Sequence, residues 1–186
     1  MPQEGQVKTD ELDAQAEATR QLALAQIRQY PDPVLRLEAQ EVEAFDVDLV
    51  QLVARMTRLM EDAQGVGLAA NQVGVLRRVV VLLADGEEEP RVLVNPVILD
   101  RSDETEEETE GCLSLRSVVV PVERAVSLRV EARDAEGGPV ELELEGLAAR
   151  VAQHEVDHLD GVLILDRTTP EGRREALAVL RQAAAL

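Results

Sequence analysis

Two runs of alternating apolar and polar residues, joined by a glycine-rich turn, constrain the fold of this chain more than any other feature. Alternation with a period of two places side chains on one face of a pleated strand. The two runs therefore predict an antiparallel hairpin. The turn is Glu136-Gly137-Gly138, and the apolar residues around it are Val126, Leu128, Val130, Val140, Leu142 and Leu144.

Three other segments predict helices. Apolar residues recur at helical spacing between Asp46 and Gly65, with Asp46 or Asp48 as the expected N-cap and Gly65 as the expected stop. Residues 147–159 show the same spacing, and Pro170 is a favourable first residue for a final helix. These segments are long enough to bury one face against strands.

Short Val- and Leu-rich runs predict further strands at 78–84, 91–95 and 162–165. The acidic segment 103–110 is interpreted as a solvated loop. Helices and hairpins thus alternate without the regular repeat of a βαβ fold, which favours the α+β class. We expect antiparallel strands and hairpins packed around a central helix that covers 147–159, with a helix at the C-terminal end.

The length of 186 residues fits one core, which we assign to residues 25–186, preceded by a polar extension at 1–24. With one Phe, one Tyr and no Trp, aliphatic side chains must fill that core. The formal charge of −18 argues against general affinity for nucleic acid or anionic membranes. No apolar stretch approaches the roughly 20 residues of a membrane span, so we expect a cytoplasmic protein.

The segment His154-Glu155-Val156-Asp157-His158 is an HExxH motif within the predicted helix 147–159. Its spacing puts two imidazoles one helical turn apart, where both can reach one metal ion, with Glu155 beside them. A chance match is the alternative, because short patterns recur by accident. These are, however, the only two histidines of the chain.

Two further segments carry candidate chemistry. The only cysteine, Cys112, follows Glu110-Gly111 and is either a small buried apolar residue or a thiolate ligand. The segment Gly65-Val66-Gly67-Leu68-Ala69-Ala70-Asn71-Gln72 either ends a helix in a turn or lets the backbone approach a ligand. It lacks the Lys-Ser/Thr ending of a phosphate loop and the third glycine of a dinucleotide fingerprint.

Together these three segments resemble, in order and separation, the signature motifs of the peptide deformylase family. The resemblance covers about Gln26 to Arg167 and includes the segments 27–36 and 158–163. It implies a hydrolase that removes the formyl group from the N-terminal methionine of newly made proteins and releases formate. It also implies nascent formyl-methionyl polypeptides as partners, transient ribosome contact and a monomer.

The resemblance assigns roles residue by residue. Cys112, His154 and His158 would be the ligands of one divalent metal, Fe(II) by the family's habit, with Zn(II), Ni(II) or Co(II) as alternatives for the same donors. Glu155 would be the general acid and base, and the Gln72 side chain and the Leu113 backbone N–H would hold the oxyanion. The substrate's methionine would lie against the residues Val66, Gly67, Leu147 and Val151.

The chain departs from the family's pattern at two positions. Arg116 stands where the family commonly has a proline, and Val119 stands where one subgroup has an arginine near the substrate entrance. Two alternatives stay open beside the deformylase. One is an HExxH peptidase, although such enzymes usually take a third ligand from a downstream His or Glu. The other is a silent metal-binding or nascent-chain-binding protein on the same scaffold.

Overall fold

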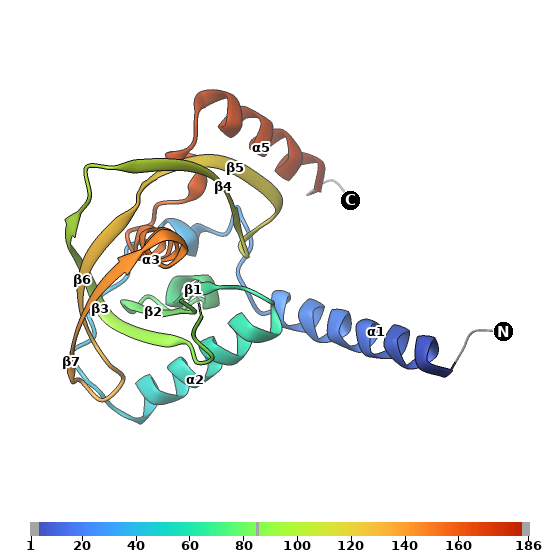
Figure 1. Ribbon diagram of the computed structural model, residues 1–186, viewed down its shortest axis with the longest axis horizontal. Helices are drawn as coiled ribbons and strands as arrows, with labels where there is room; N and C mark the ends of the chain where they lie inside the picture. Colours follow the sequence, from blue (N-terminus) through green and yellow to red (C-terminus); the bar gives the residue numbers. More distant parts are fainter. Residues whose placement is uncertain (1–3, 85, 184–186) are drawn as a thin grey trace.

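The computed structural model describes residues 4–84 and 86–183 (Figure 1). Its helices are α1 (Glu4–Leu24), α2 (Val47–Asp62), α3 (Gly146–Leu159), α4 (Ile164–Arg167) and α5 (Pro170–Ala183), with short 3-10 turns η1 (Pro33–Arg36) and η2 (Ala70–Val73). Its strands are β1 (Gly67–Ala69), β2 (Val79–Leu82), β3 (Arg91–Arg101), β4 (Thr105–Cys112), β5 (Leu115–Ala125), β6 (Ser127–Arg133) and β7 (Pro139–Glu145).

The strands form two antiparallel sheets around a central helix. Five strands pair in the order β1-β2-β3-β6-β7, and β4 pairs with β5 in a separate two-stranded sheet. Helix α3 contacts β1, β2, β6 and β7 of the larger sheet and β5 of the smaller one, so it lies between them (Figure 1). This arrangement confirms the predicted α+β class and the central helix.

The larger sheet is built from residues with the expected alternation. In β6 every second side chain is buried, from Leu128 through Val130 to Ala132. Strand β7 pairs with β6 over its whole length, with Leu128 opposite Leu144 and Val130 opposite Leu142. The predicted hairpin is confirmed, and its buried face packs on the α3 residues Ala148, Ala149, Val151, Ala152 and Leu159.

Helix α2 covers another part of the larger sheet through contacts with β1 and β2. The Asp46 side chain accepts a hydrogen bond from the Leu49 backbone N–H at 3.1 Å, which identifies Asp46 as the N-cap. The helix ends at Asp62, three residues before the predicted stop at Gly65. Its buried side chains are Leu49, Leu52, Met56, Leu59 and Met60, as the helical spacing predicts.

The strand predicted at 162–165 is wrong. After Gly161, which has a φ of 70°, the chain makes the short helix α4 instead. The Asp166 side chain accepts a hydrogen bond from the Leu163 backbone N–H at 2.9 Å and thereby stabilises the helical turn. A run of four apolar residues fits a buried strand and a buried helical turn equally well, and only this side-chain cap decides between them.

The loop predicted at 103–110 is also wrong, because most of it forms β4. Residues 105–111 pair with β5 in continuous register from Thr105 opposite Ala125 to Gly111 opposite Val119. Strand β4 has no apolar face, since residues 105–109 are exposed and only Glu110 is buried. Its strand structure therefore depends on backbone pairing with the apolar β5, which an acidic sequence does not reveal.

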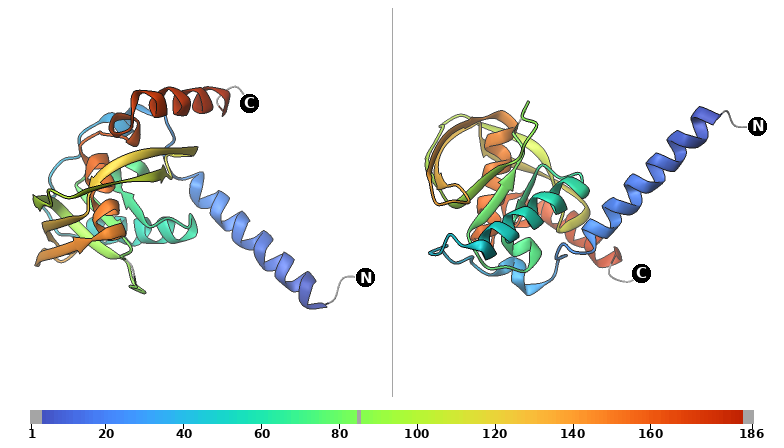
Figure 2. Two further views of the ribbon diagram at one scale, coloured as in Figure 1. Left: turned by 45° about the horizontal axis from the view of Figure 1, so that its top comes forward. Right: turned by 90° about the horizontal axis from the view of Figure 1, so that it is seen from below.

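Helix α1 projects from the rest of the molecule and meets it at its C-terminal end (Figure 2). Ala23 and Leu24 are 2% and 3% exposed and belong to the same core cluster as the buried face of α2. At the opposite end of the chain, α5 begins at Pro170 as predicted and packs on β5. Within the described residues, no helix has the length and apolar character needed to cross a membrane.

Candidate metal centre

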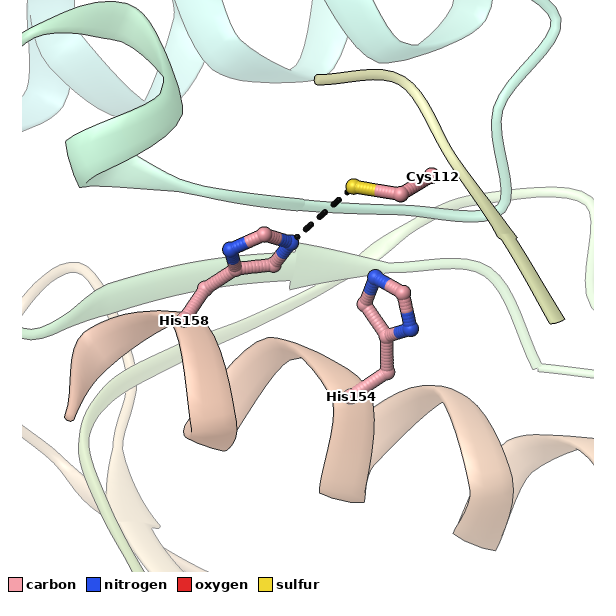
Figure 3. Close-up of side chains that lie close together, drawn as sticks. All are labelled: Cys112, His154 and His158. Carbon is pink, nitrogen blue, oxygen red and sulfur yellow. Dashed lines mark hydrogen bonds between the residues drawn. The ribbon is translucent and has the colours of Figure 1, made fainter. Parts of the chain in front are cut away.

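Three side chains predicted as metal ligands converge in the space between the two sheets. The candidate ligand atoms of Cys112, His154 and His158 all lie within 4.8 Å of one another. The Cys112 sulfur is 3.2 Å from His158 Nε2, and the two imidazoles rise from successive turns of α3 toward it (Figure 3). Cys112 and His154 are 42 residues apart in the sequence. The fold brings them together because β4 ends at Cys112, whose side chain contacts α3.

The donor set fits one divalent cation. Ligand bonds of about 2.0 to 2.3 Å place the atoms of a tetrahedral site about 3.3 to 3.8 Å apart. The Cys112 sulfur and His158 Nε2 are 3.2 Å apart, and all three candidate ligand atoms lie within 4.8 Å of one another. His154 Nδ1 contacts Glu110 Oε2 at 3.0 Å, so its Nε2 is the nitrogen available to a metal. Burial lowers the pKa of His158 well below its ordinary value, so this imidazole is neutral. A neutral imidazole is the form that binds metals.

Glu110 anchors His154 and is itself held by a buried charge network. Burial favours its neutral form, but hydrogen bonds from His154 and Arg124 outweigh that effect and lower the pKa of Glu110 to about 2. Arg124 donates to Glu110 at 2.9 and 3.0 Å and to Asp157 at 2.5 Å. Arg150 donates to Glu110 at 2.8 Å. The histidine ring is thus oriented by an ionised carboxylate whose charge is balanced.

Glu155 differs from Glu110 in having no such partners. It is 4% exposed, and its Oε2 atom has no hydrogen-bond partner among the described residues. Burial raises the pKa of Glu155 to about 7, while the nearby His154 acts in the opposite direction. A carboxyl group whose pKa lies near neutrality can both accept and return a proton at pH 7.

Gln72 lies close to the same centre, on η2. Its Oε1 accepts a hydrogen bond from the Ala69 backbone N–H at 2.8 Å, which fixes the orientation of the amide. Its Nε2 then donates to Ser114 Oγ at 3.0 Å and lies 3.7 Å from the Cys112 sulfur. The glycine loop therefore brings an oriented amide donor to the cysteine.

A cleft of about 720 Å³ opens from this centre to the surface. It is lined by all the predicted site residues except His158, which is 1% exposed. Val66 and Leu147 are 45% and 40% exposed on its walls, whereas Val151 is buried beside Gly67. The cleft also includes the two departures from the family pattern, Arg116 and Val119.

Sequence reasoning missed the residues that support the ligands. Asp157 is part of the HExxH motif but received no role, and Glu110 was assigned to a solvated loop. Arg124 sits in a strand with no visible motif, and its contact with both carboxylates depends on the fold. The available signal was the position of Glu110 two residues before the only cysteine, because metal ligands need oriented neighbours.

Comparison with known proteins identifies the family. The family model of polypeptide deformylases matches residues 24–174. A peptide deformylase of Alkalilimnicola ehrlichii is 50% identical over 147 residues, which are 78% of this chain and 82% of the relative. One from Chromohalobacter salexigens is 43% identical over 162 residues, which are 87% of this chain and 95% of the relative.

Solved structures agree with these sequence matches. The crystal structure of a peptide deformylase from Legionella pneumophila superposes with a TM-score of 0.81 at 40% identity and covers 86% of this chain and 94% of that one. The peptide deformylase of Thermotoga maritima gives a TM-score of 0.74 at 46% identity, over 77% of this chain and 97% of that one. The chain therefore belongs to the peptide deformylase family, whose members remove the formyl group from N-terminal formyl-methionine.

Proposed function

We propose that Cys112, His154 and His158 hold the single metal of this deformylase and that Glu155, Gln72 and Leu113 act on the formyl group beside it. The observation that carries the proposal is the convergence of one thiol and two imidazoles within 4.8 Å at the floor of a cleft. When bound, a divalent metal lowers the pKa of water and polarises a carbonyl group.

Glu155 is the proposed proton carrier. It is buried beside the ligands with one oxygen unpartnered, and its pKa of about 7 suits transfer in both directions. The carboxylate takes a proton from the attacking water and delivers it to the amine that leaves with the new N-terminus. Water adds to the formyl carbon, the C–N bond breaks, and formate and a free methionine amine result.

Gln72 Nε2 and the Leu113 backbone N–H are the proposed donors to the oxyanion formed during this attack. Preoriented donors stabilise such charge because they need not reorganise when it develops. The hydrogen bond between Ala69 N–H and Gln72 Oε1 supplies this preorientation for the amide. For Leu113, the Gln29 side chain donates to its carbonyl oxygen at 2.9 Å and so restrains the residue on the C-terminal side of that N–H.

The methionine side chain is proposed to lie between Val66, Leu147 and Val151, with Gly67 leaving room at the floor. These walls are apolar, and an unbranched thioether adapts well to such a slot. Gly67 is required because a Cβ at this position would lie 2.4 Å from Glu155 Oε1. The backbone of β1 at Gly67 therefore lies so close to Glu155, the proposed proton carrier, that there is no room for a side chain.

Fe(II) is the proposed metal, on the basis of the family resemblance, with Zn(II), Ni(II) and Co(II) compatible with the same donors. The proposed substrates are nascent formyl-methionyl chains, processed in the cytoplasm by a monomer in transient contact with the ribosome. This part of the proposal is supported by the family's role in protein biosynthesis.

Elemental analysis combined with an assay of formate release from a formyl-methionyl peptide tests the proposal. The wild-type protein should contain about one divalent metal per chain and release formate, and Cys112→Ala should lose both. Formate release that persists in a Cys112→Ala variant with full metal content would remove Cys112 from the ligand set. Cleavage of internal peptide bonds instead of formate release would favour an HExxH peptidase.

A further inference from the structure

The mouth of the cleft includes residues from outside the core that the family model matches. Arg20, Gln21 and Leu24 of α1 line the same cleft as His154 and Glu155, and Arg116 lines it from the start of β5. Only Leu24 of these three α1 residues falls within the matched range of 24–174. Figure 2 shows α1 projecting from the rest of the molecule, with its C-terminal end against it. The N-terminal extension thus forms part of the wall of the cleft.

The last turn of α1 is held firmly enough to present a side chain. Ala23, Leu24 and Ile27 are each no more than 3% exposed and share a core cluster with α2. Arg20 lies four residues before Leu24, so the two side chains occupy the same face of the helix one turn apart. Burial of Leu24 therefore fixes the direction in which Arg20 leaves α1.

Two charged groups deeper in the cleft are already paired. Glu110 and Arg150 pair with each other at 2.8 Å, and both are at least nine-tenths buried. By contrast, among the described residues Arg20 has only a 3.8 Å contact with the exposed Glu17 of its own helix, a kind of pair that contributes little. Arg116 is exposed and makes no ion pair with any described residue. Two guanidinium groups at the mouth are thus available to a ligand.

We propose that Arg20 and Arg116 bind a carboxylate carried by the substrate beyond its formyl-methionine, so that the enzyme favours acidic residues at the second to fourth positions. This inference rests on the proposed active site, because the methionine must lie at the floor for the following residues to reach the mouth. An extended chain advances about 3.3 to 3.6 Å per residue, so the next few residues run outward along the cleft. Guanidinium groups suit carboxylates because their paired N–H donors match the two oxygens.

The net charge of the chain, taken alone, predicts a preference for cationic rather than acidic peptides. A formal charge of −18 attracts cationic peptides over long distances and repels acidic ones. The local guanidinium groups favour acidic peptides only after the substrate has entered the cleft. A preference for Glu over Lys would therefore be evidence that Arg20 and Arg116 bind the carboxylate. It could not arise from the overall electrostatic field of the protein.

The test measures kcat/KM for C-terminally amidated formyl-methionyl tetrapeptides that carry Glu, Gln or Lys at the second, third or fourth position. Amidation makes the Glu side chain the only carboxylate. At low salt the wild type should prefer Glu over Gln by about two- to fivefold at one or more positions, as expected for exposed charge pairs. The preference should disappear at about 1 M salt, where the Debye length is about 3 Å.

Variants then assign the preference to residues. In the double variant Arg20→Gln/Arg116→Gln the Glu-to-Gln ratio should fall to about one, and Arg20→Glu should shift the preference toward Lys. Arg174→Gln is the matched control, since Arg174 lies on α5 and pairs only with Glu171. It should retain the wild-type ratio.

Two results would overturn the inference. One is a wild-type preference for Lys peptides, and the other is a Glu preference that survives in the double variant. Both leave the proposed active site intact if the neutral Gln peptides are deformylated. A wild type that releases no formate even from the Gln peptides would instead refute the proposed function, and the inference would fall with it.

Discussion

Charge is arranged differently at the floor of the cleft and at its mouth. At the floor, the Glu110 carboxylate is 6% exposed and contacts Arg124, Arg150 and His154. At the mouth, Arg116 is exposed and Arg20 is half-buried, and neither has a strong partner among the described residues. A buried charge must be paired because removing it from water is costly. A charge in contact with water needs no protein partner and is available to bind a ligand. The floor therefore specifies the geometry of the site, and the mouth can only adjust which substrates are preferred.

The floor also contains two carboxyl groups near His154, those of Glu110 and Glu155, whose pKa values are shifted in opposite directions. Hydrogen bonds from His154 and Arg124 overcome the effect of burial and keep the pKa of Glu110 at about 2, so it is a permanent charge. Glu155 lacks these bonds, and burial raises its pKa to about 7. These opposite shifts support the proposed roles, in which Glu110 orients His154 and Glu155 exchanges protons.

The largest expected difference between the two regions is in stability. Arg124→Met leaves Glu110 and Asp157 without their shared partner, and breaking a buried pair in this way costs about 3 to 5 kcal/mol. Arg116→Met removes the same charge at the mouth and should change the free energy of unfolding by no more than about 0.5 kcal/mol. Urea unfolding of both variants beside the wild type, with a chelator present, measures the difference without a contribution from metal binding.

Equal losses in the two variants would contradict the comparison. A small loss for both would mean that Arg124 contributes no more than a surface pair and that Glu110 is not held by it. A large loss for both would mean that Arg116 is part of the folded core rather than an available group at the mouth.

A smaller effect is expected from a methyl group added at the floor. Gly67→Ala places a Cβ 2.4 Å from Glu155 Oε1 and 2.7 Å from Val151 Cγ1, so the carboxyl group must move. A displacement of about 1 Å at a reacting group can cost about 10²-fold, and we expect kcat/KM for a formyl-methionyl peptide to fall by roughly that factor. Metal content should stay at the wild-type value. Wild-type activity in this variant would show that the position of Glu155 is not critical.

The sequence predicts the position of a site residue well where that position depends on spacing within one helix or strand. His154 and His158 are one helical turn apart wherever they occur on a helix, so their common face follows from the motif. Helix α2 and the β6–β7 hairpin follow in the same way from apolar periods of about 3.6 and 2. Cys112 required the family resemblance, because nothing local brings it to α3.

The remainder depends on contacts between distant segments. Strand β4 pairs with β5, and the buried Glu110 contacts Arg124 and Arg150 from other elements. The extension at 1–24 was expected to be separate from the catalytic core, and its division from the core stays a prediction. The structure nevertheless brings Arg20 to the cleft, a placement that depends on where Leu24 packs.

The central claim is that Glu155 carries the proton at the floor of the cleft without holding the metal. The measurement is kcat for formate release by Glu155→Gln, together with its metal content and melting temperature. Glutamine keeps the size of the side chain and one acceptor oxygen but cannot take up a proton at neutral pH. Glu145→Gln is the matched control, because Glu145 is the exposed N-cap residue of the same helix.

We expect Glu155→Gln to retain its metal and its melting temperature while kcat falls by about 10²- to 10⁴-fold, the usual effect of losing a positioned general base. Glu145→Gln should match the wild type in all three measurements. Loss of metal in Glu155→Gln would make Glu155 a ligand or an anchor of one. Wild-type kcat in a folded, metal-loaded Glu155→Gln variant would contradict the account, because another group would then have to transfer the proton.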